Sequence, residues 1–259
     1  MNNLQHRLFG FFGPKKLLFI ILLLNISILS YSLNFSVAPV GFAVELDKPS
    51  THEVTILNNT TEPLRLNAVF QSDSEFGEKY NLDSNLTIFP KTISLKPAGK
   101  QTVRFRVKPN SSMKDGEYTS LLTFTEIPGE IKTVSSNNKN NVSSNLNFIT
   151  KISISVYGYK GNLIHKGTFS DIKLNYNGNS VIISASSFSE GNTSLKFSYS
   201  LKVQGSNAET SGLFGISARE GKKDLSLSAQ LGPNLKGKKA KLVITDQNGK
   251  VYYDKVHTL

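Results

Sequence analysis

The sequence of 259 residues predicts an all-β protein built from two sandwich domains in tandem. Short runs rich in Val, Ile, Leu, Thr, Phe and Tyr alternate apolar with polar residues, which is typical of strands that bury one face. Clusters of Gly, Pro, Asn and Asp separate these runs, and almost no segment shows the period of a helix. The chain beyond residue 32 is long enough for two domains of about 100 residues each.

The N-terminus has the order of a secretory signal peptide. Three basic residues precede a mostly apolar run from Leu17 to Leu29, which is followed by the small residues Ser30 and Ser32. The run is about 13 residues long, shorter than the roughly 20 that span a bilayer. We therefore expect residues 1–32 to be cleaved after Ser32, with an uncleaved membrane anchor as the less favoured alternative. The expected location is the periplasm, rather than the cell surface.

Seven runs in residues 33–158 are predicted to be strands, which is the number in an immunoglobulin-like sandwich. They are Phe35–Leu46, His52–Asn58, Leu64–Phe70, Leu86–Phe89, Thr102–Lys108, Glu117–Ile127 and Leu146–Tyr157.

Residues 159–259 repeat this texture and predict a second immunoglobulin-like sandwich. Asn177-Gly178 and Asn248-Gly249 each separate two apolar runs, and Asn-Gly favours the positive φ angles of tight hairpins. We expect both pairs to form hairpin turns. The boundary between the domains is placed where the alternation stops, at Gly158-Tyr159.

The segment before the last strand of the first domain differs from the rest of the chain. Residues 128–145 are rich in Asn and Ser with little to bury, so we expect them to be mobile. Leu146–Tyr157 then alternates with a period of two. We expect Ile152 to Val156 to fill the domain's own core, whereas Leu146 and Phe148 lie beside the mobile segment, where an apolar edge is available to another chain.

Composition and motifs argue against catalysis. The chain has no Cys, which excludes disulfides, thiolate metal sites and lipid attachment through cysteine. Its four His residues lack the spacing of a zinc site, and no nucleophile elbow or phosphate-binding loop is present. We therefore expect no enzyme activity, metal or cofactor.

The positive charge of the chain does not predict nucleic-acid binding. The formal net charge is +11, and the expected signal peptide contributes three of the basic residues and no acidic one. The most concentrated basic segment, Lys236–Lys241, has no aromatic side chain for base stacking. A solvated basic face explains it better, and the membrane is contacted only through the signal peptide.

Residues 33–158 resemble the N-terminal domain of periplasmic pilus-assembly chaperones. The matching motifs occur in the family's order along the chain. They are Val54 to Asn58 with Pro63-Leu64, Phe89-Pro90 with Leu95 to Gly99 and Val103-Arg104, and Glu117-Tyr118 with Glu126-Ile127-Pro128.

The resemblance implies that the last strand lends apolar side chains to an exported, pilin-like subunit, while two basic residues hold the subunit's C-terminal carboxylate. The implied subunit-binding residues are Leu146, Phe148, Ile152 and Ile154. The two expected clamp positions hold Phe42 and Ser153, which leaves Lys151 as the candidate carboxylate anchor.

Two functional hypotheses remain open at this stage. The first is a periplasmic chaperone-like protein that binds exported subunits by strand addition, with an outer-membrane usher as a possible further partner and a homodimer as a possible way to cover the edge. The second is a structural immunoglobulin-like surface protein or adhesin component, in which the same strand is fully buried.

Overall fold

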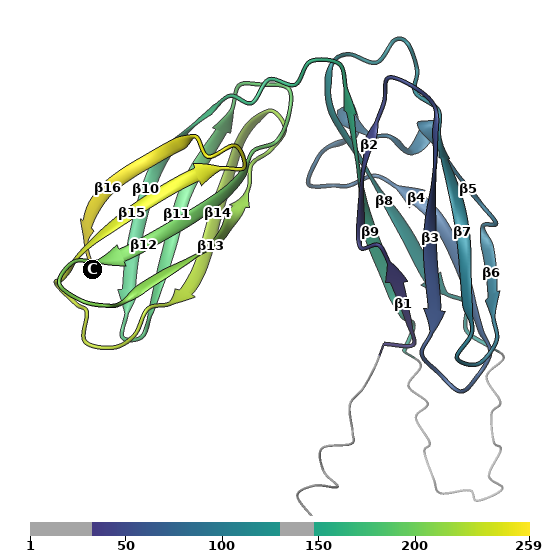
Figure 1. Ribbon diagram of the computed structural model, residues 1–259, viewed down its shortest axis with the longest axis horizontal. Coiled ribbons are helices and arrows are strands. Elements are labelled where there is room, and N and C mark those ends of the chain that lie inside the picture. Colours follow the sequence, from purple (N-terminus) through teal and green to yellow (C-terminus); the bar gives the residue numbers. More distant parts are fainter. Residues whose placement is uncertain (1–32, 130–147) are drawn as a thin grey trace, which may run out of the picture.

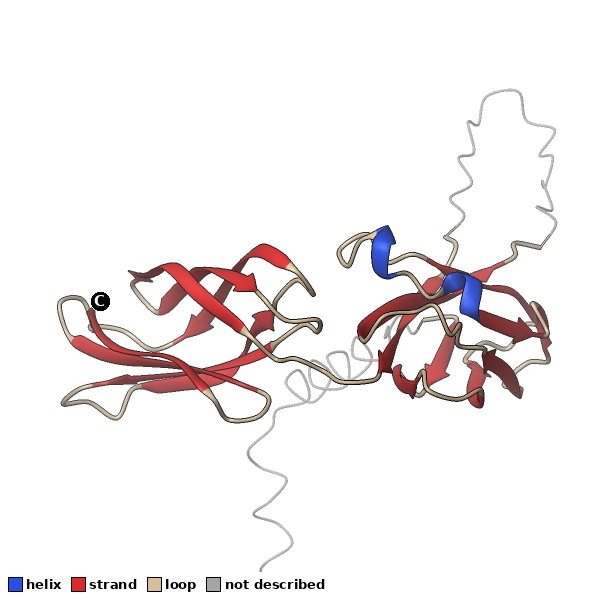
Figure 2. Ribbon diagram, turned by 90° about the horizontal axis from the view of Figure 1, so that it is seen from above, coloured by secondary structure: helices blue, strands red, loops and turns tan. Residues whose placement is uncertain are grey.

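The computed structural model describes residues 33–129 and 148–259, and strands dominate both parts. Figure 1 shows two β-sandwiches that the chain joins at one end of each, and Figure 2 shows the two layers within each sandwich. The tandem immunoglobulin-like fold is therefore confirmed. The expected signal peptide, most of the expected mobile segment and Leu146 lie outside the described residues. No helix in the described part has the length and apolar composition of a membrane span.

The first sandwich packs a four-stranded sheet, in the order β1-β3-β7-β5, against a five-stranded sheet, in the order β2-β9-β8-β4-β6. Its core contains the fully buried side chains of Phe35, Leu66, Phe105 and Phe124. The strands are β1 (Phe35–Ala38), β2 (Gly41–Glu45), β3 (Ser50–Asn58), β4 (Leu64–Gln71), β5 (Leu86–Phe89), β6 (Thr92–Leu95), β7 (Lys100–Val107), β8 (Gly116–Glu126) and β9 (Lys151–Lys160). Two single-turn 3₁₀ helices, η2 (Glu78–Tyr80) and η3 (Asp83–Asn85), lie between β4 and β5.

The first predicted strand is in fact two strands in different sheets. The expected run Phe35–Leu46 divides into β1, which pairs with β3, and β2, which pairs with β9. Pro39 lies between them, and proline cannot donate a hydrogen bond to a ladder, so the strand is interrupted there. This division determines which strands border β9.

Two further details of the first sandwich differ from the strand prediction. The four-residue strand β6 was not predicted, because its run alternates over only four residues between Pro90 and Pro97, too short to stand out as a strand. The last strand, β9, begins at Lys151 rather than Leu146 and continues to Lys160, past the expected domain boundary at 158.

The second sandwich packs a sheet in the order β10-β11-β14 against one in the order β13-β12-β15-β16. Both expected hairpins are confirmed, with Gly178 at φ +66° and Gly249 at φ +80° in their turns. The strands are β10 (Gly167–Asn177), β11 (Ser180–Ser189), β12 (Lys196–Val203), β13 (Glu209–Ile216), β14 (Gly221–Gln230), β15 (Lys239–Asp246) and β16 (Val251–Thr258).

Arg219 is the centre of the contact between the two sandwiches. Its side chain is buried, its Nε donates a hydrogen bond of 2.6 Å to the backbone oxygen of Glu117, and its guanidinium lies 3.4 Å from the centre of the Tyr80 ring. Two exposed ion pairs also cross the joint, Lys79 with Glu220 and Lys223 with Glu75, each at 3.0 Å. The joint therefore combines one buried cation with exposed pairs that are individually weak.

Candidate functional site

The strand β9 has an open flank along its first four residues. On one side it pairs with β8 over its whole length, from Lys151 opposite Thr125 to Lys160 opposite Gly116. On the other side β2 pairs with it in parallel only from Ser155 onward. Because β1 has crossed to the other sheet, no strand among the described residues covers this flank from Lys151 to Ile154.

The backbone groups that face this flank can be identified from the ladder. The carbonyl of Tyr159 accepts a hydrogen bond from Leu46 N on the β2 side, whereas Thr150 O accepts one from Glu126 N on the β8 side. Successive residues of a strand direct their N–H and C=O groups to opposite flanks. Lys151 and Ser153 therefore point their backbone groups to the open flank, where a further strand has donors and acceptors to pair with.

The four proposed subunit-binding side chains have different environments. Phe148 is 84 % exposed, and its neighbour Ile149 is 53 % exposed. Ile152 is half-buried against the first core, and Ile154 is only 3 % exposed within it. Leu146 lies outside the described residues. Phe148 is thus available to another molecule, whereas Ile154 is enclosed in the core and directs its backbone groups toward β8.

The position expected to carry a basic clamp residue on β2 belongs to an aromatic cluster. The Phe42 ring lies 4.9 Å from the Phe105 ring and 5.7 Å from the His52 ring, in edge-to-face contacts. Partial burial of His52 in this cluster lowers its pKa, because desolvation disfavours the charged imidazolium. This place is therefore apolar and does not attract a carboxylate.

The second expected clamp position is also occupied without a charge. The Ser153 hydroxyl lies 2.8 Å from the hydroxyl of Thr123 on β8. Lys151 is exposed, and none of the described acidic groups forms an ion pair with it. Its ammonium group is available to a carboxylate beside the open flank.

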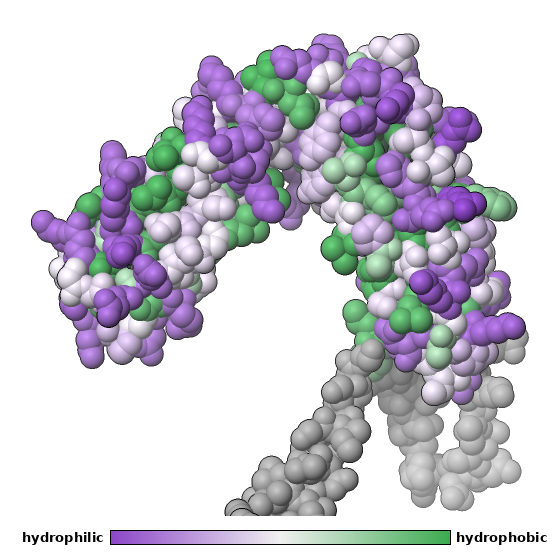
Figure 3. All heavy atoms as spheres, viewed as in Figure 1, coloured by the Kyte–Doolittle hydropathy of each residue, from purple (hydrophilic) through white to green (hydrophobic). Residues whose placement is uncertain are grey.

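Hydrophobic side chains gather on the side of the first sandwich that contains the open flank of β9. Figure 3 shows them along the inner border of that domain, in the region where Figure 1 places β1, β2 and β9. The loop residue Val40, which precedes the start of the β2 ladder with β9, is 83 % exposed. A monomeric protein rarely leaves adjacent apolar side chains in water unless they bind something.

The sequence analysis missed a group of residues between the two sandwiches. Glu117 on β8, Tyr157 and Tyr159 on β9, and Ser194 and Lys196 from the second domain line one cavity there. Alternation along β9 indicated that the two tyrosines share a face, but nothing local linked them to residues of the other domain. Among the described residues, no group of three or more acidic or His side chains is arranged to hold a metal ion.

Comparison with known proteins agrees with the geometry of the first domain. Residues 37–156 match the family of pili and flagellar-assembly chaperones, in its PapD N-terminal domain. No curated protein matches the chain. The solved structure of the YadV chaperone aligns with a TM-score of 0.50 at 13 % identity, over 88 % of this chain and 100 % of the YadV chain.

Two more solved chaperones align with this chain at lower TM-scores. The periplasmic chaperone SfaE aligns with a TM-score of 0.48 at 12 % identity, over 87 % of this chain and 100 % of its own. The Salmonella enterica chaperone SafB was solved in complex with the SafA pilin. It aligns with a TM-score of 0.46 at 12 % identity, over 89 % of this chain and 98 % of its own.

At such identities the likeness to YadV shows the fold, and the family match is carried by the sequence of the first domain. The motifs around Asn58, Pro90 and Glu126 lie inside the matched range and in the expected order. The resemblance of the first domain, residues 37–156, to the N-terminal domain of pili and flagellar-assembly chaperones is therefore confirmed.

Proposed function

We propose that this protein is a periplasmic chaperone that binds exported, pilin-like subunits by strand addition along the open flank of β9. The observation that carries the proposal is the unpaired flank from Lys151 to Ile154, next to the exposed Phe148. Added strands gain affinity from main-chain hydrogen bonds and specificity from alternate side chains. An open, apolar strand edge is a hazard for a protein that has no partner for it.

The side chains have separate parts in this binding. Phe148 packs against apolar side chains of the client, and covering a large apolar side chain is worth about 1.5–3 kcal/mol. Ile152, which is half-buried, adds to this contact, whereas Ile154 fills the domain's own core and holds the strand in place. Lys151 binds the client's C-terminal carboxylate, and an outer-membrane usher receives the loaded subunit.

Substitution of Phe148 with Asp tests the proposal. Because Phe148 is 84 % exposed, Phe148→Asp is expected to change the free energy of unfolding by no more than about 0.5 kcal/mol, the usual range for surface substitutions. It is expected to abolish co-purification of the exported subunit that the wild-type protein retains in periplasmic extracts. Thermal melting and quantitative pull-down measure the two effects.

Phe89→Asp is the matched control. Phe89 is 80 % exposed on β5, in the other sheet, so the same change of charge there should leave the subunit bound. Subunit binding that survives Phe148→Asp removes the proposed mechanism. Unfolding of the first domain by Phe148→Asp favours instead the structural surface protein, in which this strand is buried.

A further inference from the structure

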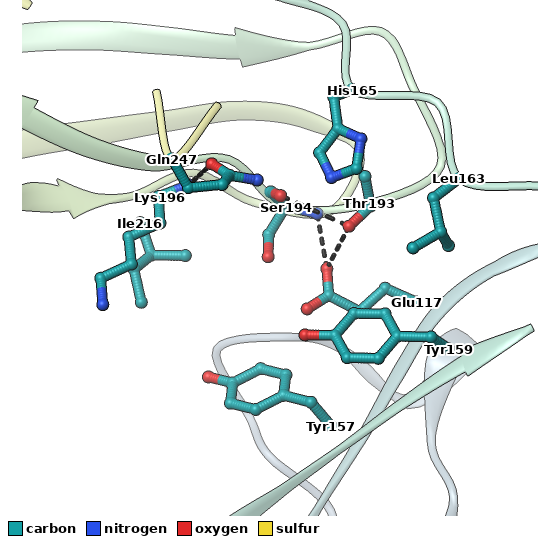
Figure 4. A pocket seen from close by; sticks show the side chains of 10 residues that line it. All are labelled: Glu117, Tyr157, Tyr159, Leu163, His165, Thr193, Ser194, Lys196, Ile216 and Gln247. Atoms are coloured by element: carbon teal, nitrogen blue, oxygen red, sulfur yellow. Dashed lines mark hydrogen bonds between the residues drawn. The ribbon is translucent and has the colours of Figure 1, made fainter. Parts of the chain in front are cut away.

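A cavity of about 380 Å³ lies between the two sandwiches, within the range of small-ligand sites. Glu117, Tyr157 and Tyr159 line it from the first domain, and His165, Ser194 and Lys196 from the second. Figure 4 shows the Glu117 carboxylate between the tyrosine rings and the second domain. None of these residues belongs to the open flank of β9.

Glu117 brings a buried negative charge to this cavity. The residue is only 2 % exposed, and its Oε2 accepts hydrogen bonds from Ser194 N at 2.5 Å and from the Thr193 hydroxyl at 3.1 Å. Its other oxygen, Oε1, has no hydrogen bond with any described residue and points into the cavity in Figure 4. Oε1 is not among the enclosed side-chain atoms that lack a partner in the described residues, so it is accessible to a ligand that enters the cavity.

No basic side chain among the described residues forms an ion pair with the Glu117 carboxylate. Arg219 donates to the backbone oxygen of Glu117 and stacks on the Tyr80 ring, so its guanidinium is committed to the joint. Lys196 is exposed at the rim, and no ion pair joins it to Glu117 among the described residues. The cavity thus holds an anionic acceptor without a cation bound to it.

The two tyrosines complete an environment that favours a cation. Burial, together with the charge of Glu117, raises the pKa of Tyr159 to about 12, and burial also raises the pKa of Tyr157. Both hydroxyls therefore stay protonated at neutral pH and add no competing charge. Their rings offer negatively polarised faces, to which ammonium and guanidinium groups are attracted.

We propose that this cavity is a binding site for an alkylammonium or guanidinium group, held by Glu117 Oε1 beside the rings of Tyr157 and Tyr159. Such a group occurs on a Lys or Arg side chain of a bound polypeptide and on free polyamines. The volume of the cavity accommodates one such side chain rather than a folded segment. Binding of an anion is disfavoured because Glu117 repels it. The Lys196 side chain is exposed to solvent, so its charge attracts an anion only weakly.

Titration with small probes tests this without a client. Nα-acetyl-lysine amide represents a lysine side chain within a peptide, and cadaverine represents a free amine. Nα-acetyl-norleucine amide is the uncharged control, because it resembles the lysine amide but lacks the ammonium group. Both amines are expected to bind saturably and to shift the NMR signals of Tyr157, Tyr159 and the Ser194 amide. Stronger binding of the lysine amide assigns the site to polypeptides, and stronger binding of cadaverine assigns it to free amines.

Glu117→Gln is expected to weaken binding of the amines by about tenfold or more, because it replaces a charged hydrogen bond with a neutral one of the same shape. Glu220→Gln removes a carboxylate that lies at the joint but outside the cavity lining, and is expected to leave binding unchanged. Lys196→Ala removes the rim charge and is expected to strengthen binding, a gain that a folding defect cannot produce.

Equal binding of the norleucine amide, or an unchanged affinity in Glu117→Gln, overturns the proposal. If Glu117→Gln fails to fold, the direction of the Lys196→Ala effect decides the matter: weaker binding of the amines, or binding of acetate in their place, overturns it. Since the probes need no subunit, these results are independent of strand addition at β9.

Discussion

Lys151 is an exposed cation at the first residue of β9, beside the flank that lacks a strand. The neighbouring positions where a basic clamp was expected are uncharged, with Phe42 in an aromatic cluster and Ser153 paired with Thr123. A solvated ion pair at Lys151 is worth up to about 1 kcal/mol. Under the proposed function, a client carboxylate is therefore expected to contribute less to binding here than at a buried two-cation clamp.

This leads to a prediction for the client's C-terminus. Amidation of a client peptide should weaken its binding to the wild-type protein by no more than about fivefold, as expected for an exposed ion pair. The same amidation should have no effect on binding to Lys151→Gln, because the pair is then already absent. Calorimetric titration of the four combinations measures the coupling. Equal losses from amidation in both proteins would exclude Lys151 as the anchor.

At the scale of the element, β9 has two different environments along its length. From Ser155 to Tyr159 it is paired on both sides and belongs to the interior of its sheet. From Lys151 to Ile154 it is an edge, although Ile154 still fills the core. The crossing of the chain at Pro39 produces this difference, because it takes β1 away from the sheet that contains β9.

Ser153→Pro tests whether the open flank is the binding surface. The N–H of Ser153 points away from β8, so its loss leaves the β8 ladder intact, and proline is tolerated on edge strands in this orientation. Client binding is expected to fall by about tenfold or more, since one ladder bond is lost and the ring obstructs the added strand. Backbone hydrogen exchange checks that the β8 side stays protected.

Ser153→Ala separates the backbone effect from the side chain. It removes the hydrogen bond with Thr123, worth about 0.5–1.5 kcal/mol of stability, but retains the N–H. It should therefore bind the client as the wild-type protein does. Normal binding by Ser153→Pro would place the interface elsewhere on the domain.

At the scale of the whole molecule, the joint around Arg219 holds the two sandwiches together. Arg219 belongs to the second domain, and its side chain is 5 % exposed. It contacts the first domain at two points, the backbone oxygen of Glu117 on β8 and the ring of Tyr80. Domains of one chain generally move relative to each other unless a large apolar interface or specific groups fix them. Arg219 fixes them through a planar cation, which lysine does not reproduce.

Arg219→Lys is therefore predicted to loosen the arrangement of the domains without unfolding either one. The loss of a charged hydrogen bond and of the ring contact is expected to cost about 2–4 kcal/mol of interdomain coupling. Small-angle scattering should show a broader distribution of dimensions, and denaturant unfolding should separate into two transitions. Arg65→Lys, on the exposed face of β4, is the control. A scattering curve identical to that of the wild type would contradict this role.

The sequence by itself determined most of the strands, the two hairpin turns, the tandem sandwich fold and the resemblance of the first domain. These depend on patterns within a few residues, such as the alternation of β9 and the Asn-Gly pairs, because side-chain period and turn angles are local properties. The same alternation indicated that Ile154 and Val156 belong to the core, where both are buried.

Only the tertiary structure decided which strands are neighbours and what lies between the domains. The open flank of β9 depends on β1 leaving its sheet, and the environment of Glu117 depends on residues 76 and 77 positions away, Thr193 and Ser194. No local pattern encodes such pairings, because they result from how whole sheets and domains pack against one another. The hydrogen bonds of Glu117 Oε2 with Thr193 and Ser194 exist only once both sandwiches are in place.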